Sequence, residues 1–552
     1  GEGDTAVRAQ VLPALPKLYE GLACQVADVD LKALKTLPPK PYTQGELVKS
    51  MKGVAKLVSD PRLKQKLKDT VGIGTEATRA NIIGGLIIGA LPGLTSTMAV
   101  ALLVPITYGM DVNHGLILLV SVYIGGIAGG LVSASLLNIP GTPASVATTF
   151  DAYPMAKKGL AGRALSYGVF SAFLGGIFSF FCLVLLAPPL STFALDFGPC
   201  EYFSLVLFTL SCIVSISHKS LIKGFISAAL GLLLSCVGLS ETDGMPRFDF
   251  GIADLQSGFS VMPVLIGMFA VSQILIEVRS IREPYTIMNA TFTQREFWRV
   301  ALDVLRQWKN VIRSALIGTG IGILPGVGPG LSNIVAYSQA KAASKEPETF
   351  GTGNPNGIIA SEVASCASTG GAMIPLLTLG IPGDATTMMM LGAFMLQGLQ
   401  PGPLLMRDNP ELIMLIYLAF FISVILMLLM LIYGIRLMVK ALSLPREILF
   451  PIIVMLCVIG CYALNSSMFD VWVFFGMGIL GTVMAALNFP LLPLVLGLML
   501  GRMAESQLRI SITLGHGTPA AFLDSPIAMF FIAISILSVA YSLYNMRKKA
   551  AK

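Results

Sequence analysis

The chain has 552 residues, of which 54% are hydrophobic and only 12% are charged, and its formal net charge is +7. Soluble domains average about 25% charged residues, so this composition excludes an ordinary soluble domain. Apolar runs of about 20 residues recur along the chain and predict an all-α protein that crosses a bilayer many times. Basic loops between membrane spans account for the net positive charge, so no nucleic-acid partner is expected from it.

Residues 1–80 differ from the rest of the chain. They carry 22 charged residues, against 47 in the remaining 472, and contain no membrane-length apolar run. Their sequences "PPKPYT" and "VGIGTEATRA" resemble part of a bacterial topoisomerase III. That part of the family lacks the domain of the nucleophilic tyrosine and the metal-binding carboxylates. We therefore interpret 1–80 as a soluble segment fused in front of a membrane protein. The alternative is an impaired chimera that begins with a DNA-binding fragment.

Residues 81–163 form the predicted core of a first repeat, which two proline-glycine breaks interrupt. The breaks are "GALPGLTSTMAV" (89–100) and "LLNIPGTPAS" (136–145), and the turn between them has no basic residue. Proline removes a backbone donor and glycine admits unusual dihedral angles, so each break ends one helix and starts another. After the second break, Thr142 is the expected N-cap and Pro143 the first helical residue.

Residues 164–313 are predicted to be connecting helices and a cytoplasmic linker. Basic segments should lie inside the cell and acidic ones outside. This rule alternates correctly along the chain, from "KKGLAGR" (157–163) inside, through "SETDGMPRFDF" (240–250) outside, to the basic linker 279–313 inside. The segment "GRMAESQLR" (501–509) fits poorly and is expected outside despite its arginines.

Residues 314–406 repeat the same two breaks, as "GILPGVGPGLSNIV" (322–335) and "LTLGIPGDATT" (377–387). The offset is 233 residues at the first break and 242 at the second, and the loop 341–357 holds the difference. This order indicates an internal duplication. The turn after Leu-Pro-Gly is basic in this copy only, so the two copies should run in opposite senses. Inverted repeats with broken helices are typical of secondary transporters.

The two Ile-Pro-Gly breaks predict a binding site. Exposed backbone at membrane depth is tolerated only beside protein or a water-filled cavity. A helix N-terminus offers free N–H groups and a partial positive charge, so two such ends that converge would bind an anion, most simply a carboxylate. The hydroxyl groups expected to contribute are those of Thr142, Ser145, Thr148, Thr386 and Thr387. Helix kinks and back-bonded hydroxyls explain any one of these residues equally well.

Two acidic residues are candidates for coupling to a cation. Asp384 follows the second Ile-Pro-Gly, and a carboxylate at membrane depth is costly and therefore functional by default. It is interpreted as a helix cap or as a ligand for a coupling cation. Glu362 is a weaker second candidate, placed near the membrane surface.

Other function classes find little support in the sequence. The eight cysteines form no CxxC pair and the three histidines are scattered, so neither a metal site nor a catalytic thiol is predicted. A membrane-embedded enzyme would need a catalytic cluster, and we expect no enzyme activity. A channel is possible in principle, but broken inverted repeats favour alternating access.

Two long motifs surround the Ile-Pro-Gly breaks: "LLNIPGTPASVATTFDAYPMAKKGLAGRAL" and "GGAMIPLLTLGIPGDATTMMMLGAFMLQGLQPGPLL". Both resemble sequences of the large membrane subunit of the tripartite tricarboxylate transporters. The likeness runs from about Asn81 to the C-terminus. It implies a bacterial inner-membrane transporter that imports citrate or other carboxylates, driven by Na⁺ or H⁺, without a cofactor. It also implies two partners, a small membrane subunit and a periplasmic solute-binding protein. The basic tail "RKKAAK" (547–552) places the C-terminus in the cytoplasm.

The family motifs match at individual positions of both copies. The resemblance adds Asn138, Pro140, Gly141, Pro382 and Gly383 to the substrate-binding candidates. Departures occur at "EVASCA" (362–367) and "AGGLVSA" (128–134), and they leave the identity of the carboxylate open.

A further departure is that only "NIIGGLIIGA" remains of the apolar segment ahead of the first Leu-Pro-Gly. This predicts a first broken helix of about half length and weak insertion or transport. The complete prediction is an all-α polytopic protein with inverted repeats, broken helices and re-entrant hairpins, about 10–12 membrane segments, and further helices over 407–552.

Overall fold

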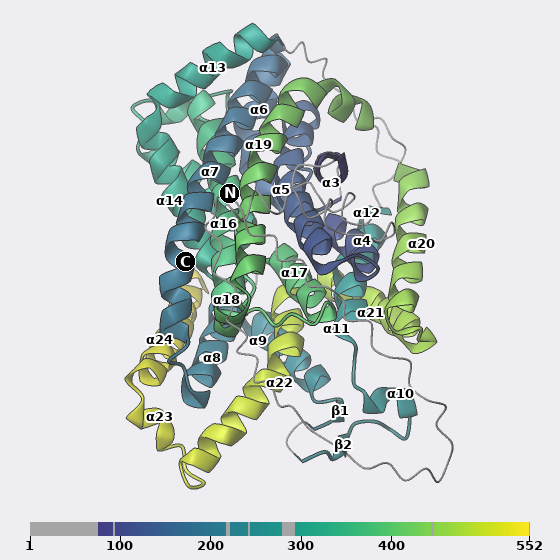
Figure 1. Ribbon diagram of the computed structural model, residues 1–552. Helices are drawn as coiled ribbons and strands as arrows, with labels where there is room; N and C mark the ends of the chain where they lie inside the picture. Colours follow the sequence, from purple (N-terminus) through teal and green to yellow (C-terminus); the bar gives the residue numbers. More distant parts are fainter. Residues whose placement is uncertain are drawn as a thin grey trace, which may run out of the picture. The chain divides into compact units, whose positions relative to one another are not determined.

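The computed structural model describes residues 76–91, 94–216, 221–240, 243–278, 293–442 and 446–550. The chain divides into two compact units, 1–72 and 73–552, and the first of them lies outside the described residues, with nearly all of the topoisomerase-like segment. In the described part, helices dominate and one pair of short antiparallel strands is present, β1 (Gly238–Leu239) and β2 (Pro246–Arg247). The all-α prediction is confirmed (Figure 1).

Seven helices of the described part are long and apolar enough to cross a membrane, which confirms a polytopic membrane protein. They cover Val112–Leu137, Pro143–Ala194, Pro410–Ile435, Glu447–Asn465, Met468–Ala486, Leu491–Leu514 and Pro526–Tyr544. Six shorter apolar helices accompany them, as expected where proline-glycine breaks divide membrane segments.

Each predicted repeat contains the same order of helices. In the first, α3 (Glu76–Ala90), α4 (Ser96–Tyr108) and α5 (Val112–Leu137) precede a short 3₁₀ turn, η1 (Pro143–Ser145), and α6 (Val146–Met155). In the second, the order is α14 (Trp308–Ile323), α15 (Gly328–Ala342), α16 (Pro355–Leu379) and α17 (Ala385–Leu396). Leu-Pro-Gly separates the first two helices of each repeat, and Ile-Pro-Gly follows the third. Pro92 and Gly93 of the first break lie outside the described residues.

The other helices complete the described part. They are η2 (Ala156–Leu160), α7 (Ala161–Ala194), α8 (Pro199–Ile216), α9 (Leu221–Ser235), α10 (Ala253–Gln256), α11 (Val261–Ile266), η3 (Gly267–Val271), α12 (Ser272–Glu277), α13 (Gln294–Arg306), η5 (Pro347–Thr349), α18 (Pro403–Asp408), α19 (Pro410–Ala441), α20 (Arg446–Asn465), α21 (Met468–Ala486), α22 (Leu491–Leu514), α23 (Ala521–Asp524) and α24 (Pro526–Ala550). Figure 1 shows α13 and α6 at one end of the molecule and β1, β2 and α10 at the other.

Two glycine contacts show that the repeats share one internal geometry. A Cβ atom on Gly141 would lie 2.4 Å from the carbonyl oxygen of Gly89, and a Cβ atom on Gly383 would lie 2.7 Å from that of Gly322. Each pair joins the glycine of Ile-Pro-Gly to the last turn of the first helix of the same repeat. No residue with a side chain fits so close to backbone, so both contacts require glycine.

The first two helices of each repeat form a re-entrant hairpin. Gly85 approaches Val122 and Gly89 approaches Gly126, so α3 and α5 run parallel. The intervening helix α4 must therefore turn back, with its tip at Leu-Pro-Gly. The second repeat repeats this arrangement, because Gly318 approaches Ala364 and Gly322 approaches Ser368.

The two repeats run in opposite senses, as the charges of their loops predict. Gln397, at the end of α17, donates a hydrogen bond to the Thr107 carbonyl oxygen beside the α4–α5 turn. Gly353, in the α15–α16 loop, donates its N–H to Asp151 of α6. Each repeat's turn thus lies where the other repeat's last short helix ends. Because α5 crosses the membrane between its turn and α6, the two turns lie on opposite sides.

The first helix is longer than the sequence analysis expects. α3 begins at Glu76 and has 15 residues, close to the 16 of α14, its counterpart in the second repeat. The helix therefore extends from the apolar "NIIGGLIIGA" into the sequence that precedes Asn81. The first helix is therefore not half as long as its counterpart, although its apolar part is still Asn81–Ala90, and the expected weak insertion or transport stays a prediction.

Ion pairs explain why residues 501–509 fit the charge rule poorly. Glu505 of α22 lies 2.7 Å from Arg247 and 2.8 Å from Arg509, and Asp243 lies 3.3 Å from Arg509. These contacts place the segment beside the loop 240–250, which is predicted to lie outside. Asp243, 266 positions away in the sequence, thus pairs with Arg509, and a count of local charges does not include this pairing.

Candidate functional site

Four helix starts meet around one cavity of about 250 Å³. They are the starts of α4, η1, α15 and α17, so all four proline-glycine breaks contribute, two from each repeat. The lining residues are Thr95, Ser96, Thr97, Ile127, Thr142, Pro143, Ala144, Phe269, Gln273, Gly326, Val327, Gly328, Pro329, Gly330, Asp384, Ala385, Thr386 and Leu492. The first N–H groups of a helix have no backbone partner within it, so this cavity collects the donor ends of several elements.

Asp384 caps α17 with both carboxylate oxygens engaged. Its Oδ1 accepts hydrogen bonds from the backbone N–H of Thr387 at 2.7 Å and from the Thr387 hydroxyl at 2.8 Å. The Thr387 side chain also accepts from the Asp384 N–H, which completes a capping box. The other oxygen, Oδ2, accepts from the hydroxyl of Tyr123 in α5, at 2.8 Å. The predicted cap role of Asp384 is what the structure shows.

Hydroxyl groups join the starts of α4 and α17 across the two repeats. Thr386 Oγ1 lies 3.1 Å from Ser96 Oγ and 3.0 Å from Thr97 Oγ1. All three side chains are buried and line the cavity. Thr95 caps α4 by accepting the N–H of Met98 at 3.2 Å. The two opposed repeats therefore meet through side chains that can both donate and accept hydrogen bonds.

The starts of η1 and α15 make a second contact between the repeats. Asn333 of α15 donates a hydrogen bond to the Pro143 carbonyl oxygen, at 2.9 Å. Pro143 is the first residue of the new helix, as predicted, although the helix begins with one 3₁₀ turn. Thr142 occupies the N-cap position, but its hydroxyl makes no capping bond and lies 3.5 Å from Ser145 Oγ. That hydroxyl lines the cavity instead.

Two glycines of α5 allow the starts of α4 and η1, both in the first repeat, to approach this helix. A Cβ atom on Gly126 would lie 2.8 Å from the Cβ atom of Ser96. One on Gly130 would lie 2.5 Å from Ser145 Oγ and 2.6 Å from Thr142 Oγ1. The glycine-rich run "YIGGIAGGLVSAS" therefore serves close packing and places the helix starts around the cavity.

The electrostatics of the cavity come from dipoles and one carboxylate. Among the described residues, Asp384 is the one charged side chain that lines it, and no Lys, Arg or His does so. An anion in this cavity would therefore interact with helix N-termini, hydroxyl groups and the Gln273 side chain. The fixed charge of Asp384 would oppose that anion unless a cation accompanied it.

The structure brings only part of the predicted substrate set to the cavity wall. Thr142 and Thr386 line the cavity. Five other candidates are buried and do not line the cavity: Gly141, Ser145, Pro382, Gly383 and Thr387. Asn138 and Pro140 also do not line it. Whether any of these residues binds substrate stays a prediction.

Asn138 has a structural role that its position explains. It ends α5 in the left-handed conformation, with φ 58°, and its side chain is exposed. Gly380, which lies 242 positions later, ends α16 in the same conformation, with φ 70°. Asparagine and glycine are the residues that adopt this conformation most readily at a helix end.

Glu362 is buried among protein helices, and its expected position near the membrane surface stays a prediction. Its side chain is 1% exposed in α16, where the protein interior surrounds it. The Thr148 hydroxyl donates to Glu362 Oε1 at 2.5 Å and lies 3.0 Å from Ser361 Oγ. Thr148, predicted as a substrate donor, therefore contacts this carboxylate and does not line the cavity. The helix α16 packs against α7 and α14, which the sequence does not reveal.

About half of the cavity wall comes from residues outside the two Ile-Pro-Gly breaks, which were the predicted site. These residues are Thr95, Ser96, Thr97 and the segment Gly326–Gly330. The signal was present, because three consecutive hydroxyl residues begin two positions after the first Leu-Pro-Gly. Gln273, at the start of α12, had no such signal.

Comparison with known proteins identifies relatives over most of the chain. The sequence profile described as the tripartite tricarboxylate transporter TctA family matches residues 78–496. An uncharacterized 52.8 kDa protein from the TAR-I ttuC' 3' region of Agrobacterium vitis is 35% identical over 495 residues, which covers 88% of this chain and 97% of that protein. A second A. vitis protein, from the TAR-II ttuC' 3' region, is 37% identical over 226 residues, 41% of this chain and 93% of the relative.

The N-terminal segment has different relatives. A DNA topoisomerase profile matches residues 4–115. DNA topoisomerase 3 of Haemophilus influenzae is 45% identical over 82 residues, 15% of this chain and 12% of that enzyme. The enzyme from Pasteurella multocida is 47% identical over 73 residues, 13% of this chain and 11% of the enzyme. The resemblance to a fragment of this enzyme is confirmed. No solved structure matches the chain.

Proposed function

The chain belongs to the tripartite tricarboxylate transporter TctA family, and on this basis we propose that it is the membrane subunit that carries tricarboxylates or related carboxylates across the bilayer. The observation that carries the proposal is the meeting of four helix N-termini, two from each inverted repeat, around one cavity. Substrate sites of secondary transporters lie between inverted repeats, near the middle of the membrane.

The chemistry of the cavity suits a small carboxylate. Its volume of about 250 Å³ lies below the roughly 300–1,000 Å³ of pockets for drug-sized ligands. Carboxylate oxygens accept hydrogen bonds, and the cavity offers the donors of Thr97, Thr142 and Thr386 beside the helix N-termini. A bound carboxylate would replace the hydrogen bonds that Thr386 now makes to α4.

Asp384 gives a physical reason for cation coupling. Its charge lies in the cavity wall, so an anion alone would be repelled at low dielectric, whereas an anion with a cation would not. We propose that Na⁺ or H⁺ enters with the substrate. The negative charge of Asp384 makes the cation necessary, because it repels a carboxylate that enters alone. Glu362, buried with Thr148 as its hydrogen-bond donor, is the second coupling candidate.

The family also indicates how the subunit works in the cell. We propose that it resides in a bacterial inner membrane with a cytoplasmic C-terminus. A small membrane subunit assembles with it, and a periplasmic solute-binding protein delivers the carboxylate. The membrane unit needs no cofactor and performs no catalysis in this proposal.

The test is uptake of labelled citrate by vesicles that contain the chain, with the small membrane subunit and the binding protein supplied. Thr386→Val should lower the rate about tenfold or more, because a hydrogen bond to a charged group is lost. Thr482→Val is the matched control, since that hydroxyl donates within α21 to the Gly478 carbonyl oxygen and does not line the cavity. Equal rates for Thr386→Val and the unsubstituted chain would refute the site.

A DNA-related role for the N-terminal segment is the second candidate function. The topoisomerase matches over residues 4–115 favour it, although they cover only 12% of the Haemophilus influenzae enzyme. The membrane proposal expects the full chain not to retain single-stranded DNA in a filter-binding assay. Salt-sensitive retention would support the DNA-binding alternative.

A further inference from the structure

The helix α13 has an apolar face that the described protein does not cover. Its residues Phe297, Val300, Ala301 and Val304 are buried, and the helix packs on α7. On another side, Trp298 is 59% exposed and Leu302 is 60% exposed. Leu305 follows at the next helical turn and is 49% exposed. Packing on α7 accounts for one apolar face of this short helix. The second face, formed by Trp298, Leu302 and Leu305, is exposed and is expected to contact another apolar surface.

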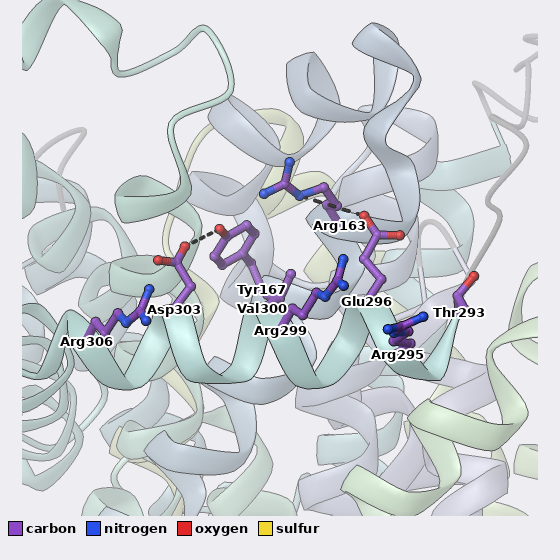
Figure 2. A pocket seen from close by; sticks show the side chains of 9 residues that line it. All are labelled: Arg163, Tyr167, Thr293, Arg295, Glu296, Arg299, Val300, Asp303 and Arg306. Atoms are coloured by element: carbon purple, nitrogen blue, oxygen red, sulfur yellow. Dashed lines mark hydrogen bonds and ion pairs between the residues drawn. The ribbon is translucent and has the colours of Figure 1, made fainter.

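A basic pocket of about 610 Å³ lies along the same helix. Arg295, Arg299 and Arg306 of α13 line it, together with Arg163 at the start of α7. Figure 2 shows Arg163 and Tyr167 above α13, joined by dashed lines to Glu296 and Asp303. The pocket therefore combines four guanidinium groups with two carboxylates.

Both carboxylates are already engaged. Glu296 Oε1 lies 3.8 Å from Arg163 Nε, and Asp303 accepts a hydrogen bond from the Tyr167 hydroxyl. Within the described part of the chain, no hydrogen bond or ion pair engages Arg295, Arg299 or Arg306. The pocket keeps a net positive charge, and planar guanidinium groups bind phosphate through paired hydrogen bonds.

We propose that this pocket binds the headgroup of an anionic phospholipid, whose acyl chains lie along Trp298, Leu302 and Leu305. Charge complementarity selects the phosphate, and the adjoining apolar face selects a lipid over a soluble anion. An amphipathic helix with basic residues on one side and Trp and Leu on another lies in the membrane interface. Arg163 of the pocket belongs to the basic loop "KKGLAGR" (157–163), so the lipid belongs to the leaflet on the side of the basic loops.

The tryptophans of the protein provide the test. Two of the three, Trp298 and Trp308, lie on or directly after α13, and the third is Trp472. The full chain with Trp472→Phe is placed in phosphatidylcholine nanodiscs that contain a low fraction of brominated phosphatidylglycerol or of brominated phosphatidylcholine. Brominated phosphatidylglycerol should quench the fluorescence more strongly. This additional quenching by phosphatidylglycerol should be lost in the double variant Arg295→Gln/Arg299→Gln.

A matched control removes the same charge elsewhere. Lys341→Gln/Lys345→Gln takes two positive charges from the α15–α16 region and should keep the excess quenching. The arginine variant must elute and melt like the parent, and if it does not, Arg299→Gln alone carries the test. Equal quenching by the two lipids in the parent would overturn the proposal, because the face would then cover a protein partner or none. Inorganic phosphate or glycerol phosphate at the same concentration as the brominated lipid should leave the excess quenching in place; if either removes it, the pocket binds a soluble anion and the proposal is overturned.

Discussion

Tyr123 of the first repeat donates a 2.8 Å hydrogen bond to Asp384, the residue that caps α17 of the second repeat. Both side chains are buried, so the bond joins the repeats at the wall of the proposed substrate cavity. It also holds the carboxylate in one orientation, with its other oxygen directed at Thr387. The charge that we assign to cation coupling is thus positioned by both repeats at once.

Tyr123→Phe removes this donor and keeps the ring. The Asp384 carboxylate then lacks one partner in a buried site, which should cost about 1–3 kcal/mol of stability and lower the melting temperature of the purified protein. Tyr433→Phe is the control, because Tyr433 is 70% exposed. A melting temperature that falls equally in both variants would contradict a specific role for the bond.

Asp384→Asn separates the cap from the charge. Asparagine caps helices about as well as aspartate, and the Tyr123 hydroxyl can turn to accept a hydrogen bond from its amide, so the start of α17 should be kept. The neutral side chain no longer opposes an anion in the cavity, so uptake should lose its dependence on Na⁺ or H⁺. The measurement is the uptake rate with and without each cation gradient. If cation dependence is unchanged, Asp384 does not couple the two ions.

Gly322→Ala tests the close contacts within a repeat. Its Cβ atom would lie 2.5 Å from the Ser368 carbonyl oxygen, so α14 and α16 must move apart. Overpacking of this kind typically costs about 1–3 kcal/mol. Gly320→Ala, in the same helix, meets nothing within 4 Å and should be neutral or stabilising. Thermal unfolding of the two variants side by side decides the point. Equal melting temperatures would show that the helices are not so close.

Asp151 holds the loop between α15 and α16. Its Oδ1 accepts the N–H groups of Gly351, Gly353 and Asn354 at 2.8–2.9 Å, and its Oδ2 accepts the Tyr337 hydroxyl at 2.9 Å. Asp151→Asn removes the negative charge and replaces one acceptor oxygen with an NH₂ group, which cannot accept from these N–H and hydroxyl donors. Each hydrogen bond lost to the charged group should cost about 1.5–3 kcal/mol of stability.

The released loop should then be cut faster by trypsin, after Lys345. Digestion of the purified protein, followed by mass spectrometry of the fragments, measures this rate. The exposed Asp196 gives the control, Asp196→Asn, which should be cut at the parent rate. A parent-like rate for Asp151→Asn would show that Asp151 does not restrain the loop.

The breaks, the duplication and the opposed senses of the repeats could be predicted from the sequence because each rests on local signals. Leu-Pro-Gly and Ile-Pro-Gly end helices wherever they occur, and loop charge indicates the side of the membrane. Asp384 could be identified as a cap because its position relative to Ile-Pro-Gly defines a helix start.

What could not be predicted depends on neighbours distant in the sequence. The burial of Glu362 follows from helices that pack around α16, and the proximity of Ser96 to Thr386 joins residues 290 positions apart. The ion pair of Arg247 with Glu505 likewise overrides a local charge count. The second apolar face of α13 becomes visible only once α7 is known to cover the first.

The account depends most on the cavity between the repeats as the place where the carboxylate binds. The most direct measurement is a cryo-EM map of the full chain with the carboxylate that the uptake assay identifies. We expect density for the bound anion between the starts of α4, η1, α15 and α17, within hydrogen-bond distance of Thr97 and Thr386. Density for the anion at another place, with this cavity unchanged, would contradict the account.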